Sequence, residues 1–462
     1  MGRPAAAAHC RSSRLFRIPA RWRSRQNGAG NHATVGAGAR RGGSRRHLGE
    51  RPAMRSEQGQ AASAPWAQAR AEFPALRDRV FLDAACVSIM PARAERAVCE
   101  LAAELARPTR RDATEHHLWM DRQRAAAPPQ VARLLGIPVE RVALVESTTH
   151  GLNIAAQSIP WRRGDEVLLC DLEFLQVAIP FVKLAERAGL RPVFLRHRGG
   201  RVEAAEFAAA LTPRTRAVVV SSTQWSSGYR IDLPLLADAC RSAGAWLVVD
   251  AIQQAGAVPV ETEGVDFLIA GGHKWLNAPM GTGFMALSER VLNELEPASW
   301  GYLNTEPPAG GWGEYFTTPG ITPDRRYDFV SSAQRFEIGG TANYPGAVCL
   351  AKSLEVVNEL GIDRAAERVW QLGERLQAGL RRLDVRLETP FDREHRAGII
   401  AFHCGSRERD SACVRHLAGR DICVAQRYTA QAGGVRVSVH YFNDEDDIDR
   451  LLDATAGFLR QS

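Results

Sequence analysis

Short apolar runs alternate with helix-patterned stretches along much of the chain, and this alternation limits the possible folds more than any other feature. Most positions in these runs are Val, Leu, Ile or Ala, as is typical of strands that are buried on both faces. Such strands occur in mostly parallel sheets covered by helices, so the sequence predicts an α/β fold. The predicted strands are Val142–Val145, Glu166–Cys170, Pro192–Leu195, Ala217–Ser222, Trp246–Asp250, Phe267–Ala270 and Gly283–Leu287.

Helical spacing of Ala, Leu and charged residues predicts helices at Ala178–Ala188 and Leu233–Ser242. The Gly-, Pro- and aromatic-rich stretch Trp300–Tyr327 then interrupts the pattern and predicts a long functional loop. Beyond it, two predicted strands lie among helices, which suits a smaller α+β domain. These elements are the helices Ala347–Leu360, Arg364–Leu380 and Asp444–Leu459 and the strands Ala397–Cys404 and Gly434–Phe442. We predict a large domain over residues 61–345 and a small C-terminal domain over residues 346–462.

The N-terminal stretch, residues 1–60, differs in composition from the rest. Residues 1–53 hold twelve arginines and one glutamate, a charge of +11, so the remainder of the chain sums to 7 − 11 = −4. A stretch rich in Ala, Gly, Ser and Arg has little material for a core. We predict a disordered basic tail, or a start codon placed too early with Met54 as the true start. An organelle transit segment and a nucleic-acid-binding arm are the alternatives.

Several classes of protein are excluded by composition. The sequence has no run of 18 apolar residues, so no membrane span is predicted. Its nine cysteines are scattered and form no CxxC pair, which indicates neither a zinc site nor a disulfide framework. We therefore expect a cytoplasmic protein, with no metal and no nucleic-acid partner.

Charged and hydroxyl side chains follow several of the predicted strands. Asp250 ends one strand and Lys274 follows the next, while Thr148 and Thr149 begin a helical pattern directly after an earlier strand. In open α/β sheets ligands bind beyond the carboxyl ends of the strands, and a helix N-terminus is suited to phosphate. Pyridoxal 5′-phosphate (PLP) requires a lysine, an acid at its ring nitrogen and a phosphate site. The sequence therefore predicts a PLP site.

The order and spacing of these motifs resemble the class V aminotransferase family of fold-type I PLP enzymes, in its cysteine desulfurase and isopenicillin N epimerase-like branch. The resemblance extends over roughly residues 70–460. "GGHKWLNAPMGTGF" resembles the lysine motif of the family, which implies that Lys274 is the Schiff-base residue and His273 a phosphate neighbour. "VVDAIQ" resembles the ring-binding motif, in which Asp250 would pair with the pyridinium nitrogen and Gln253 with the ring hydroxyl.

Four further motifs match the same family. "STTHG" resembles its phosphate loop, with Thr148 and Thr149, and "EFLQVAIPF" implies that Phe174 stacks on the ring. "RFEIGGTANYPG" resembles the stretch that gives a threonine, here Thr341, to the phosphate of the neighbouring subunit, so a homodimer is implied. "VRVSVHYFN" resembles the strand whose arginine, here Arg436, binds the substrate carboxylate.

Each residue taken alone has a plainer structural explanation. Asp250 could be a turn residue and Phe174 a core residue, and Ser/Thr runs are common helix caps. Arg436 alternates with valines, so it could face outward from a strand. The joint pattern favours the cofactor site.

The sequence also departs from the desulfurase branch. Gly271 stands where that branch has a serine, and Trp225 stands where some relatives have an asparagine. The stretch Ala425–Gly434, which matches the loop that bears the desulfurase nucleophile, contains no cysteine. Cys423 lies in an apolar run, and Cys86 is the remaining candidate thiol.

The resemblance implies an enzyme that acts at the α-carbon of an amino acid, in the manner of a transaminase. The alternative is a PLP-dependent C–S lyase that works by β-elimination without a nucleophilic cysteine, and we expect no protein persulfide from cysteine. A third hypothesis, a binding protein without activity, conflicts with the presence of Lys274, Asp250 and Gln253.

Overall fold

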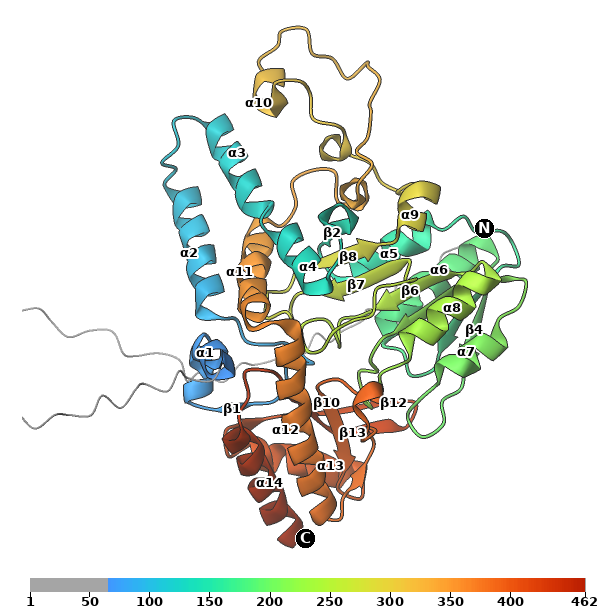
Figure 1. Cartoon of the computed structure of the whole chain (residues 1–462), viewed down its shortest axis with the longest axis vertical. Coiled ribbons are helices and arrows are strands. Elements are labelled where there is room, and N and C mark those ends of the chain that lie inside the picture. The colour runs from blue at the N-terminus through green and yellow to red at the C-terminus, as the bar shows by residue number, and fades with distance from the viewer. Residues whose placement is uncertain (1–64, 462) are drawn as a thin grey trace, which may run out of the picture. The chain divides into compact units, whose positions relative to one another are not determined.

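The structure is a computed structural model of the chain, and it describes residues 65–461 (Figure 1). The predictions for residues 1–60 therefore lie outside the described residues. Within residues 65–461, no helix combines the length and the apolar character that a membrane crossing needs.

A seven-stranded sheet forms the centre of the large domain. Six strands run parallel, and β8 runs antiparallel between its neighbours β2 and β7, so the predicted mostly parallel sheet is confirmed. Pro192 lies in β4 at the edge of the sheet, where a missing N–H group is tolerated. In spatial order the strands are β2 (Val142–Val145), β8 (Gly283–Leu287), β7 (Phe267–Gly271), β6 (Trp246–Asp250), β5 (Thr215–Ser221), β3 (Glu166–Cys170) and β4 (Arg191–Leu195).

Helices cover both faces of this sheet because successive strand residues point to opposite sides. In β6, Leu247 and Val249 join one hydrophobic core while Trp246 and Val248 join the other. One face packs on α5 (Thr148–Ser158), α6 (Leu175–Ala188) and α9 (Glu289–Glu294). The opposite face packs on α4 (Ala127–Leu135), α7 (Ala204–Ala210), α8 (Leu233–Ala243) and α11 (Tyr344–Leu360).

The segments before β2 and after α9 add short elements around α11, against which α2, α3 and α4 pack (Figure 1). The predicted loop Trp300–Tyr327 is largely irregular and includes two short helical turns. The remaining elements of these segments are α1 (Pro65–Ala71), η1 (Pro74–Arg77), β1 (Val80–Phe81), α2 (Ala92–Ala106), α3 (Ala113–Arg124), η2 (Val139–Arg141), η3 (Tyr302–Asn304), α10 (Gly311–Tyr315) and η4 (Ala333–Phe336).

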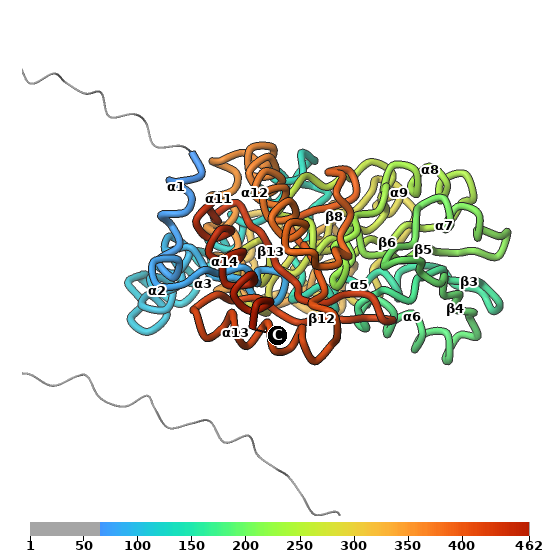
Figure 2. Tube along the Cα trace, turned by 90° about the horizontal axis from the view of Figure 1, so that it is seen from below, coloured from blue at the N-terminus to red at the C-terminus, as the bar shows by residue number. Residues whose placement is uncertain are grey.

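A second, four-stranded antiparallel sheet is formed by the C-terminal part of the chain, which faces the viewer in Figure 2. Its strands, in spatial order, are β12 (Ala425–Thr429), β13 (Ala432–Ser438), β10 (Ile399–His403) and β9 (Arg386–Leu387). The helices are α12 (Ile362–Arg382), α13 (Arg407–Ala418) and α14 (Glu445–Arg460), with a turn at η5 (Arg393–His395). The short strand β11 (Ile422–Cys423) pairs with β1, which ties the start of the described chain to this part.

The predicted strand Gly434–Phe442 is too long. The strand ends at Ser438, because the backbone turns at His440, whose N–H group donates to the Asn443 side chain at 2.9 Å. The predicted domain boundary at residues 345–346 falls within α11 and stays a prediction.

An ionic cluster in the small sheet makes its stability depend on pH. His403 lies between two carboxylates, with Nδ1 3.2 Å from Asp410 Oδ2 and Nε2 3.6 Å from Glu388 Oε2. The hydrogen bond to Asp410 and the nearby Glu388 carboxylate raise the pKa of His403 to about 9. Because the unfolded pKa is about 6.5, the charged pair stabilises the fold fully below that pH. This stabilisation is lost as the pH rises through 9.

We expect His403→Gln to lower the free energy of unfolding by on the order of 3 kcal/mol at pH 6. The difference from the wild type should shrink steadily between about pH 6.5 and pH 9, because the wild-type imidazolium then loses its proton. Thermal unfolding of both proteins across this pH range measures the difference in the free energy of unfolding. A difference that stays constant with pH would contradict the raised pKa of His403.

Candidate active site

Side chains from four strand ends meet at one edge of the large sheet. Because β2, β6 and β7 run in the same direction, their carboxyl ends lie together, as the sequence predicts. Thr148 follows β2, Asp250 ends β6, and Lys274 follows β7. Glu173 follows β3 and was not among the predicted site residues.

Asp250 is a buried carboxylate with few partners. Its Oδ1 accepts a hydrogen bond from the backbone N–H of Ile252 at 2.9 Å, and its side chain is paired with no cation within 4 Å among residues 65–461. Burial raises the pKa of Asp250 to about 7, although the Ile252 N–H group and the charge of Lys274 act in the opposite direction. A cationic partner would keep this carboxylate ionised.

Lys274 is a partly buried amine that, like Asp250, has no partner of opposite charge within 4 Å among the described residues. Its Nζ makes no hydrogen bond or ion pair with any described residue, and it lies 5.8 Å from the centre of the Phe174 ring. Burial lowers the pKa of Lys274 to about 8, while the charge of Asp250 raises it. Asp250 and Lys274 therefore influence each other electrostatically without forming an ion pair.

The start of α5 provides a polar end to the site. Ser147 caps the helix by accepting from the N–H group of His150 at 3.1 Å. Thr148 Oγ1 accepts from the Gly271 N–H at 2.9 Å, and Thr149 is exposed. The N–H groups of Thr148 and Thr149 donate to no acceptor within the described part of the chain, so they are available to an anion.

His273 lies beside this helix start. A Cβ atom built on Gly271 would lie 3.2 Å from Thr148 Oγ1 and 3.3 Å from His273 Nδ1, so the two side chains flank the same glycine. Burial lowers the pKa of His273 to about 4, which leaves the imidazole neutral at physiological pH.

Gln253 contacts Trp275, the residue that follows Lys274, and the Phe174 ring lies near the Lys274 amine. The buried Gln253 amide donates to the Ala85 carbonyl at 3.2 Å and accepts from Trp275 Nε1 at 2.9 Å. Phe174 is 43% exposed and packs edge-on against Trp225, with ring centres 5.3 Å apart. Phe174 is thus exposed and not a core residue.

Arg436 is only 1% exposed, so it does not face outward from its strand. Its guanidinium donates to the Trp225 carbonyl at 3.0 Å and to Asp83 Oδ1 at 3.1 Å, while its Nε has no partner among the residues that the structure describes. Burial lowers the pKa of Arg436, and burial raises that of Asp83.

Glu173 and Asp83 are two residues beside these side chains that the sequence analysis missed. Glu173 is fully buried and accepts from Ser221, through both N–H (3.1 Å) and Oγ (2.5 Å), and from Gln224 Nε2 at 3.2 Å. Ser221 pairs with Asp250 across β5 and β6, and the Glu173 charge contributes to the raised pKa of Asp250. A sequence signal existed, since Glu173 directly precedes Phe174.

Thr341 is separate from the other predicted residues. It is exposed on the segment between η4 and α11, and it makes no hydrogen bond within residues 65–461. Asn343, two residues further on, donates through its backbone N–H to Glu146 Oε1 at 3.3 Å.

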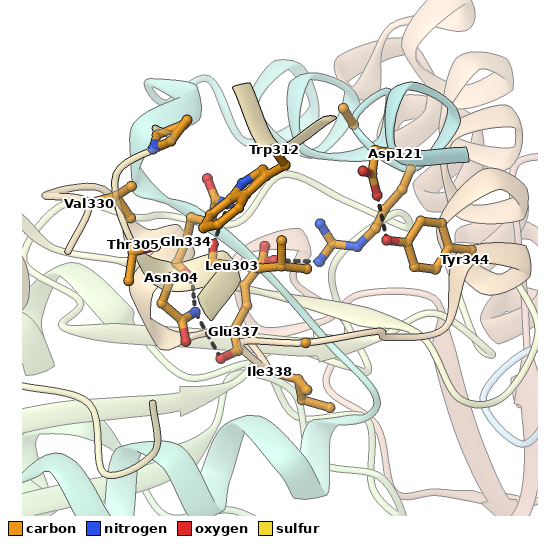
Figure 3. A pocket seen from close by; sticks show the side chains of 14 residues that line it. Asp121, Leu303, Asn304, Thr305, Trp312, Val330, Gln334, Glu337, Ile338 and Tyr344 are labelled. Atoms are coloured by element: carbon orange, nitrogen blue, oxygen red, sulfur yellow. Dashed lines mark hydrogen bonds and ion pairs between the residues drawn. The ribbon is translucent and has the colours of Figure 1, made fainter. Parts of the chain in front are cut away.

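A cavity of about 320 Å³ lies elsewhere, between α3 and the predicted long loop (Figure 3). The hydroxyl of Tyr344 donates to Asp121 at 2.5 Å on one side, and an ion pair joins Arg124 to Glu337. Trp312 covers the cavity from the loop. None of the predicted site residues lines it, so it is distinct from the edge of the sheet that carries Lys274.

The residues at this edge fit PLP. A free lysine amine, a buried acid without a cation and unused N–H groups at a helix start match the aldehyde, the ring nitrogen and the phosphate of that cofactor.

Comparisons with known proteins agree with this geometry. Residues 80–451 match the family described as aminotransferase class V. A probable cysteine desulfurase of Methanothermobacter thermautotrophicus is 29% identical over 398 residues, which are 83% of this chain and 95% of that protein. The isopenicillin N epimerase of Streptomyces clavuligerus is 29% identical over 348 residues, 73% of this chain and 83% of that protein.

Solved structures show the same fold. A C-DES mutant with glycine covalently linked to the PLP cofactor superposes with a TM-score of 0.74 at 24% identity, over 84% of this chain and 98% of that one. The apo cysteine desulfurase of Thermococcus onnurineus superposes with a TM-score of 0.73 at 22% identity, over 86% of this chain and 98% of that one.

Fold and site together define a PLP-dependent enzyme of fold-type I. More narrowly, the chain belongs to the class V aminotransferase family, as its motifs predict.

The lowered pKa of Lys274 can be measured in the cofactor-free protein. We expect its modification by cyanate to rise with a midpoint near pH 8, because only the neutral amine reacts. Asp250→Asn should move the midpoint lower, since the Asp250 charge favours the ammonium form. The chain has only two other lysines, Lys183 and Lys352, which form exposed ion pairs and serve as internal standards. Peptide mass spectrometry follows all three, and a Lys274 midpoint above pH 10 would refute the assignment.

Proposed function

We propose that the enzyme uses PLP to act at the α-carbon of an amino acid, in the manner of a transaminase. The observation that carries the proposal is that the buried Asp250 carboxylate and the partly buried Lys274 amine have opposite charges and form no ion pair. Their burial is unfavourable unless a third group pairs with them.

When bound, PLP supplies an electron-withdrawing ring that stabilises negative charge at the substrate α-carbon. Asp250 would hold a proton at the ring nitrogen, since its carboxylate has no other cation. Thr148, Thr149 and the neutral His273 would bind the phosphate by hydrogen bonds, and Gln253 would contact the ring hydroxyl. Phe174, already exposed at the site, would cover one face of the ring.

Lys274 would move the α-proton. With a pKa of about 8, a useful fraction of its amine is neutral at physiological pH and can accept a proton, and the protonated form can return it. Arg436 would bind the α-carboxylate in a bidentate fashion, and its unpartnered Nε is a donor still free for this purpose. The substrate carboxylate would compete with Asp83 for the guanidinium.

A β-eliminating C–S lyase is the second candidate. The β12–β13 hairpin borders the site through Arg436 and contains no cysteine, so a sulfur-containing substrate would have to be cleaved without a thiol from this hairpin. Cys423 is partly buried in β11 and does not belong to the hairpin. Both candidates share the removal of the α-proton by Lys274.

The proposed assembly is a homodimer in which Thr341 reaches the phosphate of the neighbouring subunit, and the proposed location is cytoplasmic. The exposure of Thr341 supports the first proposal, because an exposed hydroxyl is available to a second chain.

We expect the PLP-loaded wild type to exchange the α-proton of at least one amino acid in deuterated water, and Lys274→Ala to lose this exchange by 10³-fold or more, on the order expected for an acid–base group. Borohydride should fix the cofactor on Lys274 and on neither Lys183 nor Lys352. Proton NMR and peptide mass spectrometry provide the two readouts. Keto acid formed with an amino acceptor indicates transamination, whereas pyruvate with ammonia indicates elimination. Trapping on another lysine would overturn the proposal.

A further inference from the structure

Arg427 is a cation at the site without a carboxylate partner. It lies on β12 and is partly buried, and its Nη1 donates to the carbonyl of the adjacent Gln426 at 2.8 Å. Its Nη2 donates to the thiol of Cys86 at 3.4 Å. No carboxylate of residues 65–461 lies within 4 Å of this guanidinium. A thiol is a weak acceptor, so most of the hydrogen-bonding capacity of Arg427 is unused.

The turn at residues 83–86, whose Cys86 accepts from Arg427, also contacts other residues of the site. Asp83 in this turn pairs with Arg436, and the Ala85 carbonyl accepts from Gln253. Cys86 completes the turn through its N–H, which donates to the Asp83 carbonyl at 3.0 Å. The two arginines therefore approach one four-residue turn.

The register of the small sheet places the two arginines side by side. Ala425 pairs with Arg436 and Arg427 pairs with Gly434 across β12 and β13. Paired residues share a face, and residues two apart on a strand share it too, so Arg427 and Arg436 are diagonal neighbours on the same face. Such neighbours lie about 7–8 Å apart.

The carboxylates of the site are engaged by groups other than Arg427. Asp83 pairs with Arg436, and the charge of Asp250 acts on Lys274. Glu173 accepts hydrogen bonds from Ser221 and Gln224. Arg427 is left without a counter-ion, beside two other cations that it repels. An incoming anion would relieve this repulsion.

We propose that Arg427 binds a second anionic group, carried by the side chain of the substrate, while Arg436 binds the α-carboxylate. The substrate class is then an α-amino acid with a side-chain carboxylate, sulfinate or sulfonate. Cys86 holds the Arg427 guanidinium until the anion takes its place. This inference rests on the proposed function, because it assigns the substrate of the same site.

The test compares amino acids that differ only in side-chain charge. For the PLP-loaded wild type, kcat/KM for α-proton exchange should be at least tenfold higher with aspartate or glutamate than with asparagine or glutamine, since an arginine–carboxylate pair stabilises only the acids. In Arg427→Gln this acid-to-amide ratio should fall at least tenfold. Arg427→Lys, which keeps the charge, should retain part of the ratio.

A binding readout separates recognition from turnover. The PLP-loaded Lys274→Ala protein, titrated calorimetrically with aspartate and with asparagine, should prefer aspartate, and adding Arg427→Gln should remove the preference. Arg415→Gln, an exposed arginine of α13, is the matched control and should change neither ratio. Cys86→Ala should keep or increase the preference, because it removes the competing contact.

Exchange of neutral amino acids without any preference for the acids would overturn this inference and leave the proposed function intact. An unchanged ratio in a folded Arg427→Gln protein with full cofactor content would also overturn it. Failure of every amino acid to exchange would overturn the proposed function and the inference together.

Discussion

The site depends on a buried carboxylate and a partly buried amine of opposite charge that form no ion pair. Asp250 and Lys274 lie at adjacent strand ends, each with a pKa shifted toward its neutral form by burial. A direct ion pair would be the simple solution for a protein that needs only stability, and among the described residues these two groups do not form one. Burying these groups without partners is unfavourable, and under the proposed function PLP would pair with each of them.

The surrounding elements keep this separation fixed. Both faces of the large sheet pack on helices, so the strand ends cannot move toward each other without disturbing two hydrophobic cores. The short turn from Asp83 to Cys86 connects the large sheet, through Gln253, with the small one, through Arg436 and Arg427. Under the proposed function, substrate recognition would therefore be linked to the packing of the small sheet against the large one.

Strands and motif residues could be predicted because their signals are local. The seven central strands are nearly continuous apolar runs, and Asp250 and Lys274 follow two of them at a fixed spacing. The hairpin strand β12 was missed because its residues, "AQRYT", are mostly polar. Glu173, Asp83 and Arg427 were missed because their meaning comes from contacts with Ser221, Arg436 and Cys86, which are distant in sequence. Contacts between residues that are far apart in the sequence produce no periodic pattern from which a single sequence could predict them.

The protonation of the cofactor ring tests this arrangement most directly. PLP labelled with ¹⁵N at the ring nitrogen can be bound to the wild type and to Asp250→Asn, and the ¹⁵N chemical shift reports whether the nitrogen carries a proton. With Asp250 as its partner, the nitrogen of the wild type should show the shift of a protonated ring, and that of Asp250→Asn the shift of an unprotonated one. The same shift in both proteins would contradict the pairing of Asp250 with the cofactor.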